Sequence, residues 1–440
     1  MPNFKYAYKV TFAYIKRFKW ILLLGVIFGV IIFFLIKYLF PILTRPRPER
    51  IGVTGRYHTD TLPSFVLSEI SYGLTKIDDN KNVVPSLASA WETPDKGKTW
   101  IFHLSDDQVW HDGSKVNSDS IAYEFSDVEV QKSDDKTISF KLQNIFSPFP
   151  SVLARPTFKK GLLGTGTWKV EKVQLSGGFV TELQILNSDD RKKVYKFYPT
   201  LERTKLAFKL GEVDSIIEVL DPKPFDNWKT TTISENVNIN QVVTLFFNTQ
   251  DKVLSEKNLR QALTYAIDKE KLGERAISPI SPSSWAYNPQ VKKYAFDKTR
   301  AKELINDLPK EAKSDLKINL VTTTNLLNVA EQISNDWKEI GVETRVQVSS
   351  IIPSEFQTFL TIYDIPQDPD QYSIWHSTQI TTTNISKYSS ARIDKLLEEG
   401  RTSLDMDQRK NTYLDFQRFV LEDLPAAFLY HPKYYTIKRS

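Results

Sequence analysis

A short segment in the last quarter of the chain carries residues suited to holding a small polar ligand. Residues 363–377 read YDIPQDPDQYSIWHS and contain Asp364, Asp368, Asp370, Tyr372 and Trp375. Carboxylates and aromatic rings on one loop offer hydrogen-bond acceptors beside apolar faces, a combination typical of selective small-ligand pockets. A second interpretation stays open, in which Asp-Pro turn chemistry only shapes the loop.

The chain carries no motif for catalysis. Its five histidines form neither an HExxH motif nor a short metal-binding spacing, it has no cysteine, and no GxSxG motif occurs. We therefore expect a binding protein with no catalytic residue, metal or cofactor. A hydrolase built from scattered carboxylates is the less favoured alternative.

An apolar segment near the N-terminus predicts a membrane anchor. Residues 20–43, WILLLGVIFGVIIFFLIKYLFPIL, are long enough to cross a bilayer, which takes about 20 apolar residues. Residues 1–19 are basic without an acidic residue, so they should stay in the cytoplasm. No small-residue cleavage pattern follows, which favours an uncleaved signal anchor over a removed signal peptide. Residues 44–50 would be a stiff linker, and residues 51–440 a binding domain on the extracytoplasmic face of the cytoplasmic membrane.

The positive charge of the chain belongs to this N-terminal end. The formal net charge is +5, of which residues 1–50 contribute +8, so the remainder is mildly acidic at −3. A nucleic-acid partner normally requires a basic patch on the folded domain. We therefore expect no nucleic-acid partner.

The elements that must position the ligand loop begin with a turn-rich block, residues 69–113. Residues 78–82 and 93–97 are clusters of turn formers. Residues 99–104 alternate between apolar and polar, as a strand with one buried face does, and residues 110–113 close another turn. After the block, residues 118–125 have the spacing of a helix. The tryptophans of the block are expected to be scaffold.

Four motifs of this region resemble the extracellular solute-binding proteins of the peptide and nickel importer family. They are SYGLT, VVPSLASAWE, DKGKTWIFHL and VWHDGSKV, at residues 71–75, 83–92, 95–104 and 109–116. Residues 259–272, LRQALTYAIDKEKL, add a further match. Four motifs in the order and spacing of one family are far more specific than a single short match.

The resemblance implies an α/β fold of the two-lobed periplasmic-binding-protein type. It would be of the large peptide-binding class, with a trimmed accessory subdomain. The first lobe would comprise about residues 51–240 and 425–440, and the second lobe about residues 241–424. The glycine-rich residues 161–170, GLLGTGTWKV, are similar to a segment of the family. A phosphate loop is the alternative for them, but no Lys-Ser or Lys-Thr pair follows the glycines.

The resemblance also implies ligand-facing positions outside the loop. Tyr57 would lie on the floor of the cleft, Asn248 near the hinge, and Trp285 or Tyr287 on a second-lobe loop facing the cleft. Arg56 is a further candidate on the cleft floor.

One position of the ligand loop departs from the family. Peptide-binding relatives place an aspartate three residues before the Asp-Pro pair, where it meets the ligand's ammonium group. Here that position is Ile365, and Asp364 precedes it. A shift of one residue in an extended segment reverses the direction of the side chain. We therefore expect Asp364 to matter less than Asp368, unless a one-residue insertion keeps Asp364 in its role.

The function implied by the resemblance is a monomeric receptor that delivers a peptide or similar small polar solute to the permease subunits of an ABC importer. A solute sensor, or a chaperone-like binding domain without transport, is the alternative. The presence of a permease partner would distinguish them.

Overall fold

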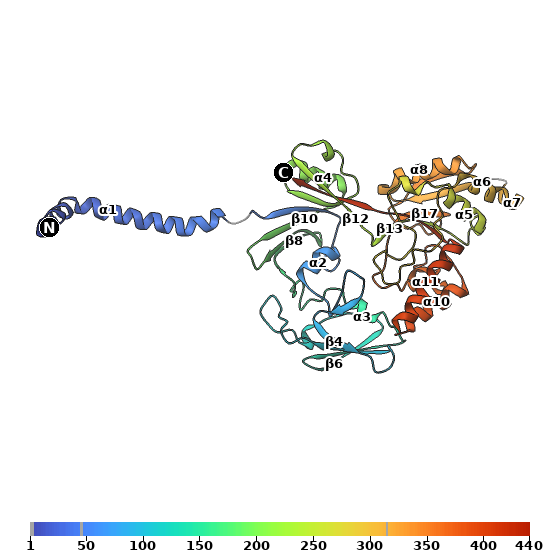
Figure 1. Ribbon diagram of the computed structural model, residues 1–440, viewed down its shortest axis with the longest axis horizontal. Coiled ribbons are helices and arrows are strands. Elements are labelled where there is room, and N and C mark those ends of the chain that lie inside the picture. Colours follow the sequence, from blue (N-terminus) through green and yellow to red (C-terminus); the bar gives the residue numbers. More distant parts are fainter. Residues whose placement is uncertain (1–3, 45–46, 314–315) are drawn as a thin grey trace.

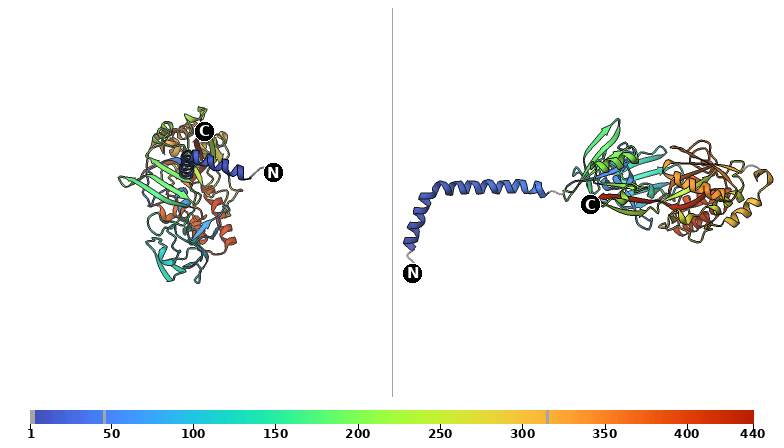
Figure 2. Two further views of the ribbon diagram at one scale, coloured as in Figure 1. Left: turned by 90° about the vertical axis from the view of Figure 1, so that its left-hand side faces the viewer. Right: turned by 90° about the horizontal axis from the view of Figure 1, so that it is seen from above.

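The computed structural model describes residues 4–44, 47–313 and 316–440. The N-terminal helix α1 (Phe4–Thr44) extends away from the rest of the chain (Figures 1 and 2). Its backbone departs from helical geometry at Phe18, and the helix bends there. Between Tyr8 and Tyr38 this helix is long and apolar enough to cross a membrane.

The first lobe is built on a seven-stranded mixed sheet in the order β12-β19-β11-β1-β10-β9-β8. Strand β1 lies inside the sheet, parallel to β10 and β11, with Ile51 and Val53 buried. Helices α2 (Ser64–Ile70) and α4 (Leu201–Leu210) pack against it (Figure 1). The strands are β1 (Glu49–Thr54), β8 (Trp168–Ser176), β9 (Phe179–Asn187), β10 (Lys192–Tyr198), β11 (Ser215–Val219), β12 (Thr231–Val237) and β19 (Lys433–Arg439).

A four-stranded antiparallel sheet, β4-β5-β7-β6, forms a separate layer of the first lobe, here called the small sheet. In β5, Trp100 and Phe102 are 5% and 0% exposed, which confirms the predicted strand with one buried face. The predicted turn before β3 is formed by Asp78, whose carboxylate accepts from the amides of Asn80 and Asn82. The elements here are β2 (Thr75–Ile77), β3 (Val83–Pro85), β4 (Ala88–Glu92), β5 (Thr99–Leu104), β6 (Val128–Asp134), β7 (Thr137–Leu142) and α3 (Phe149–Val152).

The second lobe is built on a six-stranded sheet in the order β14-β18-β13-β17-β15-β16. The central strand β13 is apolar and buried along almost its whole length, as its sequence predicts. The strands are β13 (Gln241–Phe247), β14 (Glu274–Arg275), β15 (Lys317–Thr322), β16 (Glu343–Val348), β17 (Thr358–Asp364) and β18 (Ala426–His431). The helices are α5 (Lys257–Ala266), α6 (Lys298–Asn306), α7 (Lys310–Lys313), α8 (Leu327–Lys338), α9 (Tyr372–Trp375), α10 (Ala391–Thr402) and α11 (Met406–Asp423).

Two neighbouring chain segments connect the lobes. Residues 238–240 join β12 to β13, and Pro432 joins β18 to β19. The two crossovers are linked because the amide of Asn238 donates to the carbonyl of Pro432 at 2.9 Å. Strand β18 pairs with β13 in the second lobe. The predicted return to the first lobe at residue 425 is therefore too early, since the chain returns only at Pro432.

The helix predicted over residues 118–125 is wrong. Only a 3-10 turn, η1 (Ser118–Ser120), forms there. The side chain of Asn117 accepts from the amide of Ser120, and the hydroxyl of Ser120 accepts from the amide of Asn117. This reciprocal cap closes one turn, and Ile121 is already extended.

The glycine-rich segment packs its backbone against the end of α2. A Cβ on Gly164 would lie 2.2 Å from the carbonyl oxygen of Ile70, and one on Gly166 would lie 2.4 Å from that of Glu69. Glycine is needed there for close approach of two backbones. The segment supports the packing of the first lobe, which agrees with the rejection of a phosphate loop.

Candidate functional site

A cavity of about 860 Å³ beside the first crossover is here called the central cavity. Its walls come from both lobes. They include Tyr72, Lys81 and Arg155 of the first lobe, Ile239 and Asn240 of the crossover, and Ser283 and Gln367 of the second lobe.

The wall of the central cavity is rich in hydroxyl groups. Its serines are Ser64, Ser68, Ser71, Ser86, Ser151 and Ser283. Hydroxyls both donate and accept, so they suit a polar ligand with mixed hydrogen-bonding groups.

Lys81 is the polar group of this wall that spans the cleft. Its Nζ donates to Oε1 of Gln367 at 2.9 Å, across the gap between the lobes. Burial lowers the pKa of Lys81 from its ordinary value, because it disfavours the charged form, and Asp79 partly offsets this. Within the described ranges no carboxylate forms an ion pair with Lys81.

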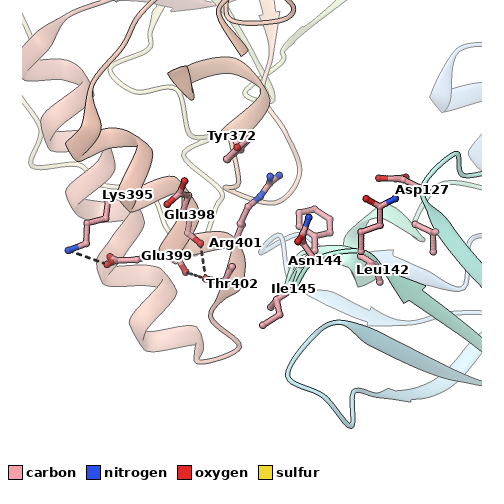
Figure 3. A pocket seen from close by; sticks show the side chains of 13 residues that line it. Asp127, Leu142, Asn144, Ile145, Tyr372, Lys395, Glu398, Glu399, Arg401 and Thr402 are labelled. Atoms are coloured by element: carbon pink, nitrogen blue, oxygen red, sulfur yellow. Dashed lines mark hydrogen bonds and ion pairs between the residues drawn. The ribbon is translucent and has the colours of Figure 1, made fainter. Parts of the chain in front are cut away.

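An outer cavity of about 890 Å³ lies between the small sheet and α10. Figure 3 shows side chains of the two sides facing each other, with Asn144 and Ile145 opposite Arg401 and Thr402. The guanidinium of Arg401 lies 4.0 Å from the ring centre of Tyr372 and 5.0 Å from that of Phe146. This cation near two rings connects the loop that follows β7 in the first lobe to the second lobe.

A third cavity of about 330 Å³ lies between the small sheet and the start of α11, and is here called the tryptophan pocket. Lys81 lines both this pocket and the central cavity, so the two adjoin. The apolar and aromatic residues of its wall are Val83, Trp91, Trp100, Pro148, Pro150, Trp285, Leu404 and Met406.

Asp368 lies in the wall of the tryptophan pocket, where it pairs with Arg409. Nη2 of Arg409 donates to Oδ1 of Asp368 at 2.7 Å, and the two side chains are only 5% and 12% exposed. The amide of Asp370 donates to the same oxygen at 2.9 Å. The carboxylate of Asp368 therefore has partners within the protein and shapes the loop.

The structure brings some of the predicted site residues to a cavity and leaves others apart. Trp285 and Asp368 line the tryptophan pocket, and Tyr372 lines the outer cavity. Tyr57 donates from its hydroxyl to the carbonyl of Thr54 at 3.0 Å and lines none of the three cavities.

Tyr287 also lines none of the three cavities. Its ring packs against the core of the second lobe, and burial raises its pKa. Arg56 lies over the ring of Phe179 at 5.7 Å in the first lobe.

Trp375 was predicted to contact the ligand, and the structure corrects this. Its side chain is 0% exposed, its Nε1 donates to Oε1 of Gln371 at 2.7 Å, and its ring lies 5.9 Å from that of Phe246. The one-turn helix α9 turns the indole into the second-lobe core. Trp375 therefore packs in the core of the second lobe beneath the loop and lines none of these three cavities.

Asn248 is a second correction, because its predicted place near the hinge is wrong. It follows the last residue of β13, whereas the crossover precedes Gln241 at the other end of that strand. Its Nδ2 donates to the carbonyl of Phe356 at 2.9 Å, and its side chain is buried. Asn248 fixes a loop at the far end of the second lobe.

The structure shows where the side chains of Ile365 and Asp364 lie, at the position where the sequence departs from the peptide-binding relatives. Ile365 is buried in the second-lobe core, while Asp364 is exposed at the end of β17. Oδ1 of Asp364 accepts from Nε2 of Gln241 at 2.6 Å. Burial, and then the negative charge of Asp364, raise the pKa of Glu218 on the first lobe. Asp364 thus lies beside the crossover and is not part of the central cavity wall.

Sequence reasoning missed Lys81, Arg155 and Gln367. Lys81 lies in a turn whose composition predicts only a chain reversal, and Arg155 follows a helix of one turn. Nothing in the neighbours of Lys81 and Arg155 marks them as cleft residues, since their proximity depends on the contact between the lobes. Gln367 lies inside the predicted ligand loop, but the composition of that loop favours its aspartates and aromatic residues. In the described part of the chain, no three His, Asp or Glu side chains come together to hold a metal ion.

Comparison with known proteins agrees with this architecture. The family model for bacterial extracellular solute-binding proteins, family 5 (middle), matches residues 82–128 and 191–377, together more than half of the chain. The oligopeptide-binding protein AppA of Bacillus subtilis is 23% identical over 86% of this chain and 83% of its own length. The dipeptide-binding protein of Escherichia coli is 26% identical over 87% of this chain and 86% of its own length.

Solved structures share the fold. NikZ from Campylobacter jejuni, in complex with Ni(L-His), has a TM-score of 0.73 at 21% identity, covering 89% of this chain and 94% of that one. Bacillus subtilis AppA, in complex with a nonapeptide, has a TM-score of 0.68 at 20% identity, covering 90% and 95%. With the motifs, the two-lobed architecture and the family match together, this chain belongs to the bacterial extracellular solute-binding proteins of family 5 and is a solute-binding receptor.

Proposed function

We propose that this receptor binds a short peptide, or a polar solute of similar size, in the central cavity and passes it unchanged to an ABC importer. The central cavity carries the proposal, because its walls come from both lobes beside the crossovers. Its volume of about 860 Å³ lies within the range of about 300–1,000 Å³ that is usual for ligand pockets. Relatives named as oligopeptide-binding and dipeptide-binding proteins support a peptide as the ligand.

Binding would close the lobes on the solute by rotation at the two crossovers, residues 238–240 and Pro432. Hinge motion of this kind is absorbed by a few residues between rigid lobes. Lys81 and Gln367 already meet across the cleft, which supports a closing contact at this place.

Trp285, Asp368 and Tyr372 are proposed to contribute to ligand contacts or to their support. Trp285 and Asp368 form part of the tryptophan pocket beside the central cavity, and Tyr372 lines the outer cavity. We expect Asp364 to contribute less, because its carboxylate is engaged by Gln241 beside the crossover.

The receptor is further proposed to be a monomer held at the cytoplasmic membrane by helix α1, with its N-terminus inside. The apolar segment from Tyr8 to Tyr38 and the basic residues before it support this arrangement. Edman sequencing of protein extracted from membranes tests the anchor. A sequence that starts at Met1 or Pro2 is expected, and a start beyond Leu43 would show that the segment is removed.

A thermal-shift screen of the full chain in detergent tests the ligand class. A solute that binds only the native state stabilises it by mass action and so raises the melting temperature. At a concentration of 100 times its Kd, the free energy of unfolding increases by about 2.7 kcal/mol. Peptides of two to five residues are expected to stabilise the protein, and sugars and metal chelates serve as comparison classes. Stabilisation by another class alone would contradict the peptide proposal.

Co-purification of a permease subunit separates transport from a sensor or chaperone-like role, in which no permease is recovered.

A further inference from the structure

The wall of the tryptophan pocket is unusually aromatic, and binding of a peptide backbone in the central cavity does not explain this. Three tryptophans, Trp91, Trp100 and Trp285, line its wall, and they come from both sides of the cleft. Trp91 and Trp100 belong to the small sheet, whereas Trp285 belongs to a loop of the second lobe. The pocket is thus assembled only when the small sheet and the second lobe lie together.

Arg409 and Asp368 neutralise each other in this wall, and the remaining charge is that of Lys81, on the side shared with the central cavity. Arg409 is paired with Asp368 at 2.7 Å, and its guanidinium also lies 5.3 Å from the ring centre of Trp285. A neutral ion pair that is already hydrogen-bonded attracts no ionic group, and its flat guanidinium can lie against an aromatic ring. Away from Lys81, the wall therefore suits a neutral group with flat apolar faces.

The size of the pocket sets the size of that group. A cavity of about 150 Å³ lined by apolar side chains is enough to hold benzene. The tryptophan pocket measures about 330 Å³, which gives room for one phenyl or indole group but not for a whole peptide. Lys81 stands between it and the central cavity, so a solute with its polar part in the central cavity could place one side group here.

From this geometry we propose that the tryptophan pocket is a specificity subsite for one aromatic side group of the bound solute. This inference rests on the proposed binding of a peptide-like solute in the central cavity. It adds that aromatic peptides are the preferred class, and that Trp285 and Met406 form the second-lobe side of the subsite.

Calorimetry on the full chain with matched tripeptides tests the proposal. The probes are trialanine and the three tripeptides in which one alanine is replaced by phenylalanine. At least one phenylalanine peptide is expected to bind about 10-fold or more tightly than trialanine, the gain from burying an aromatic side chain. Equal affinity of all four peptides would overturn the subsite while leaving the peptide receptor intact.

Two variants locate the gain. Met406→Trp adds an indole at a half-exposed position in the pocket wall, and Trp285→Ala removes one ring. Met406→Trp should abolish the preference for phenylalanine while trialanine binds as before. Trp285→Ala should also abolish the preference, whatever its effect on trialanine, because Trp285 is itself proposed to support the ligand contacts. Leu210→Trp adds the same indole to an exposed position of α4, away from all three cavities, and should retain the preference. A preference that survives in Met406→Trp would overturn the assignment.

Free indole gives a readout that does not depend on peptide binding. In saturation-transfer NMR, indole should receive magnetisation from the wild-type protein and from Leu210→Trp, and much less from Met406→Trp. If no tripeptide binds, the proposal of a peptide ligand fails. The indole measurement then tests the aromatic subsite by itself. Absence of transfer, or transfer unchanged in Met406→Trp, would overturn it.

Discussion

Nζ of Lys81 in the first lobe donates a 2.9 Å hydrogen bond to Oε1 of Gln367 in the second lobe. The bond exists only while the lobes are closed, so it favours the closed form. Gln367→Ala should shift the equilibrium toward the open form by about 1 kcal/mol, a factor of about five. Small-angle X-ray scattering should show a larger radius of gyration. Gln367→Glu, which replaces the acceptor by a carboxylate, should keep the lobes closed, and equal scattering of both variants would contradict this role.

The buried pair of Asp368 and Arg409 should stabilise the second lobe only as a pair. Asp368→Asn leaves the guanidinium without its counter-charge and should lower the free energy of unfolding by about 3 kcal/mol. Combining it with Arg409→Met removes the unpaired charge and should recover part of the loss. Urea unfolding, followed by tryptophan fluorescence, measures both variants. If adding Arg409→Met lowered the free energy of unfolding again, with no recovery, the two residues would act independently.

Gly164 should not tolerate a side chain. In Gly164→Ala the new Cβ would lie 2.2 Å from the carbonyl oxygen of Ile70, a backbone atom that cannot rotate away. We expect a loss of about 2 kcal/mol or more in stability, the scale of overpacking. The control is Gly211→Asn at the end of α4, where φ is +77° and no atom lies within 4 Å of the added Cβ. Because asparagine tolerates left-handed backbone, this variant should unfold close to the wild type, and a similar loss in both would contradict the steric argument.

His431 should make stability depend on pH. Burial lowers its pKa below the ordinary value, and the contact of its Nδ1 with the carbonyl of Gln241 at 2.7 Å, just after the first crossover, partly offsets this. The unfolded chain then binds a proton more readily than the folded chain, so stability rises with pH in this window. The contribution is complete above pH about 6.5, the unfolded pKa, and is lost as the pH falls through the folded pKa. Nearby Glu274 raises the pKa and Arg275 lowers it, both with smaller effects.

Melting temperatures from pH 8 to pH 5 check this expectation. The wild type should lose stability below pH about 6.5, and His431→Gln should show a shallower decline over the same range. Gln can still donate to the carbonyl of Gln241, so the comparison isolates the titration. Parallel pH profiles for the two proteins would contradict it.

Much of the fold could be predicted from patterns that depend on near neighbours. Alternation in β5 and the apolar run of β13 fix which faces are buried. The helix predicted at residues 118–125 failed because spacing does not reveal a reciprocal cap that stops after one turn. The boundary near residue 425 failed because β18 and β19 are consecutive, and only their pairing partners show which lobe each joins.

The site was less predictable for the same reason. The composition of residues 363–377 indicated a ligand loop, but not that α9 turns Trp375 into the core. The partners of Asp368 and Lys81, which are Arg409 and Gln367, lie far away in sequence. Contacts between lobes depend on three-dimensional packing, which no local pattern encodes.

The place of β19 in the first-lobe sheet has a consequence for export. This strand, Lys433–Arg439, lies between β11 and β12, so the first lobe needs almost the last residues of the chain to complete its sheet. If the chain leaves the cytoplasm behind an N-terminal anchor, its early strands reach the outside long before β19 does. Until residues 433–439 have crossed, β11 and β12 would have no partner between them and would present open edges to other chains. The first lobe would then complete its sheet only after residues 433–439 are outside, and deletion of these residues would leave β11 and β12 without the strand between them.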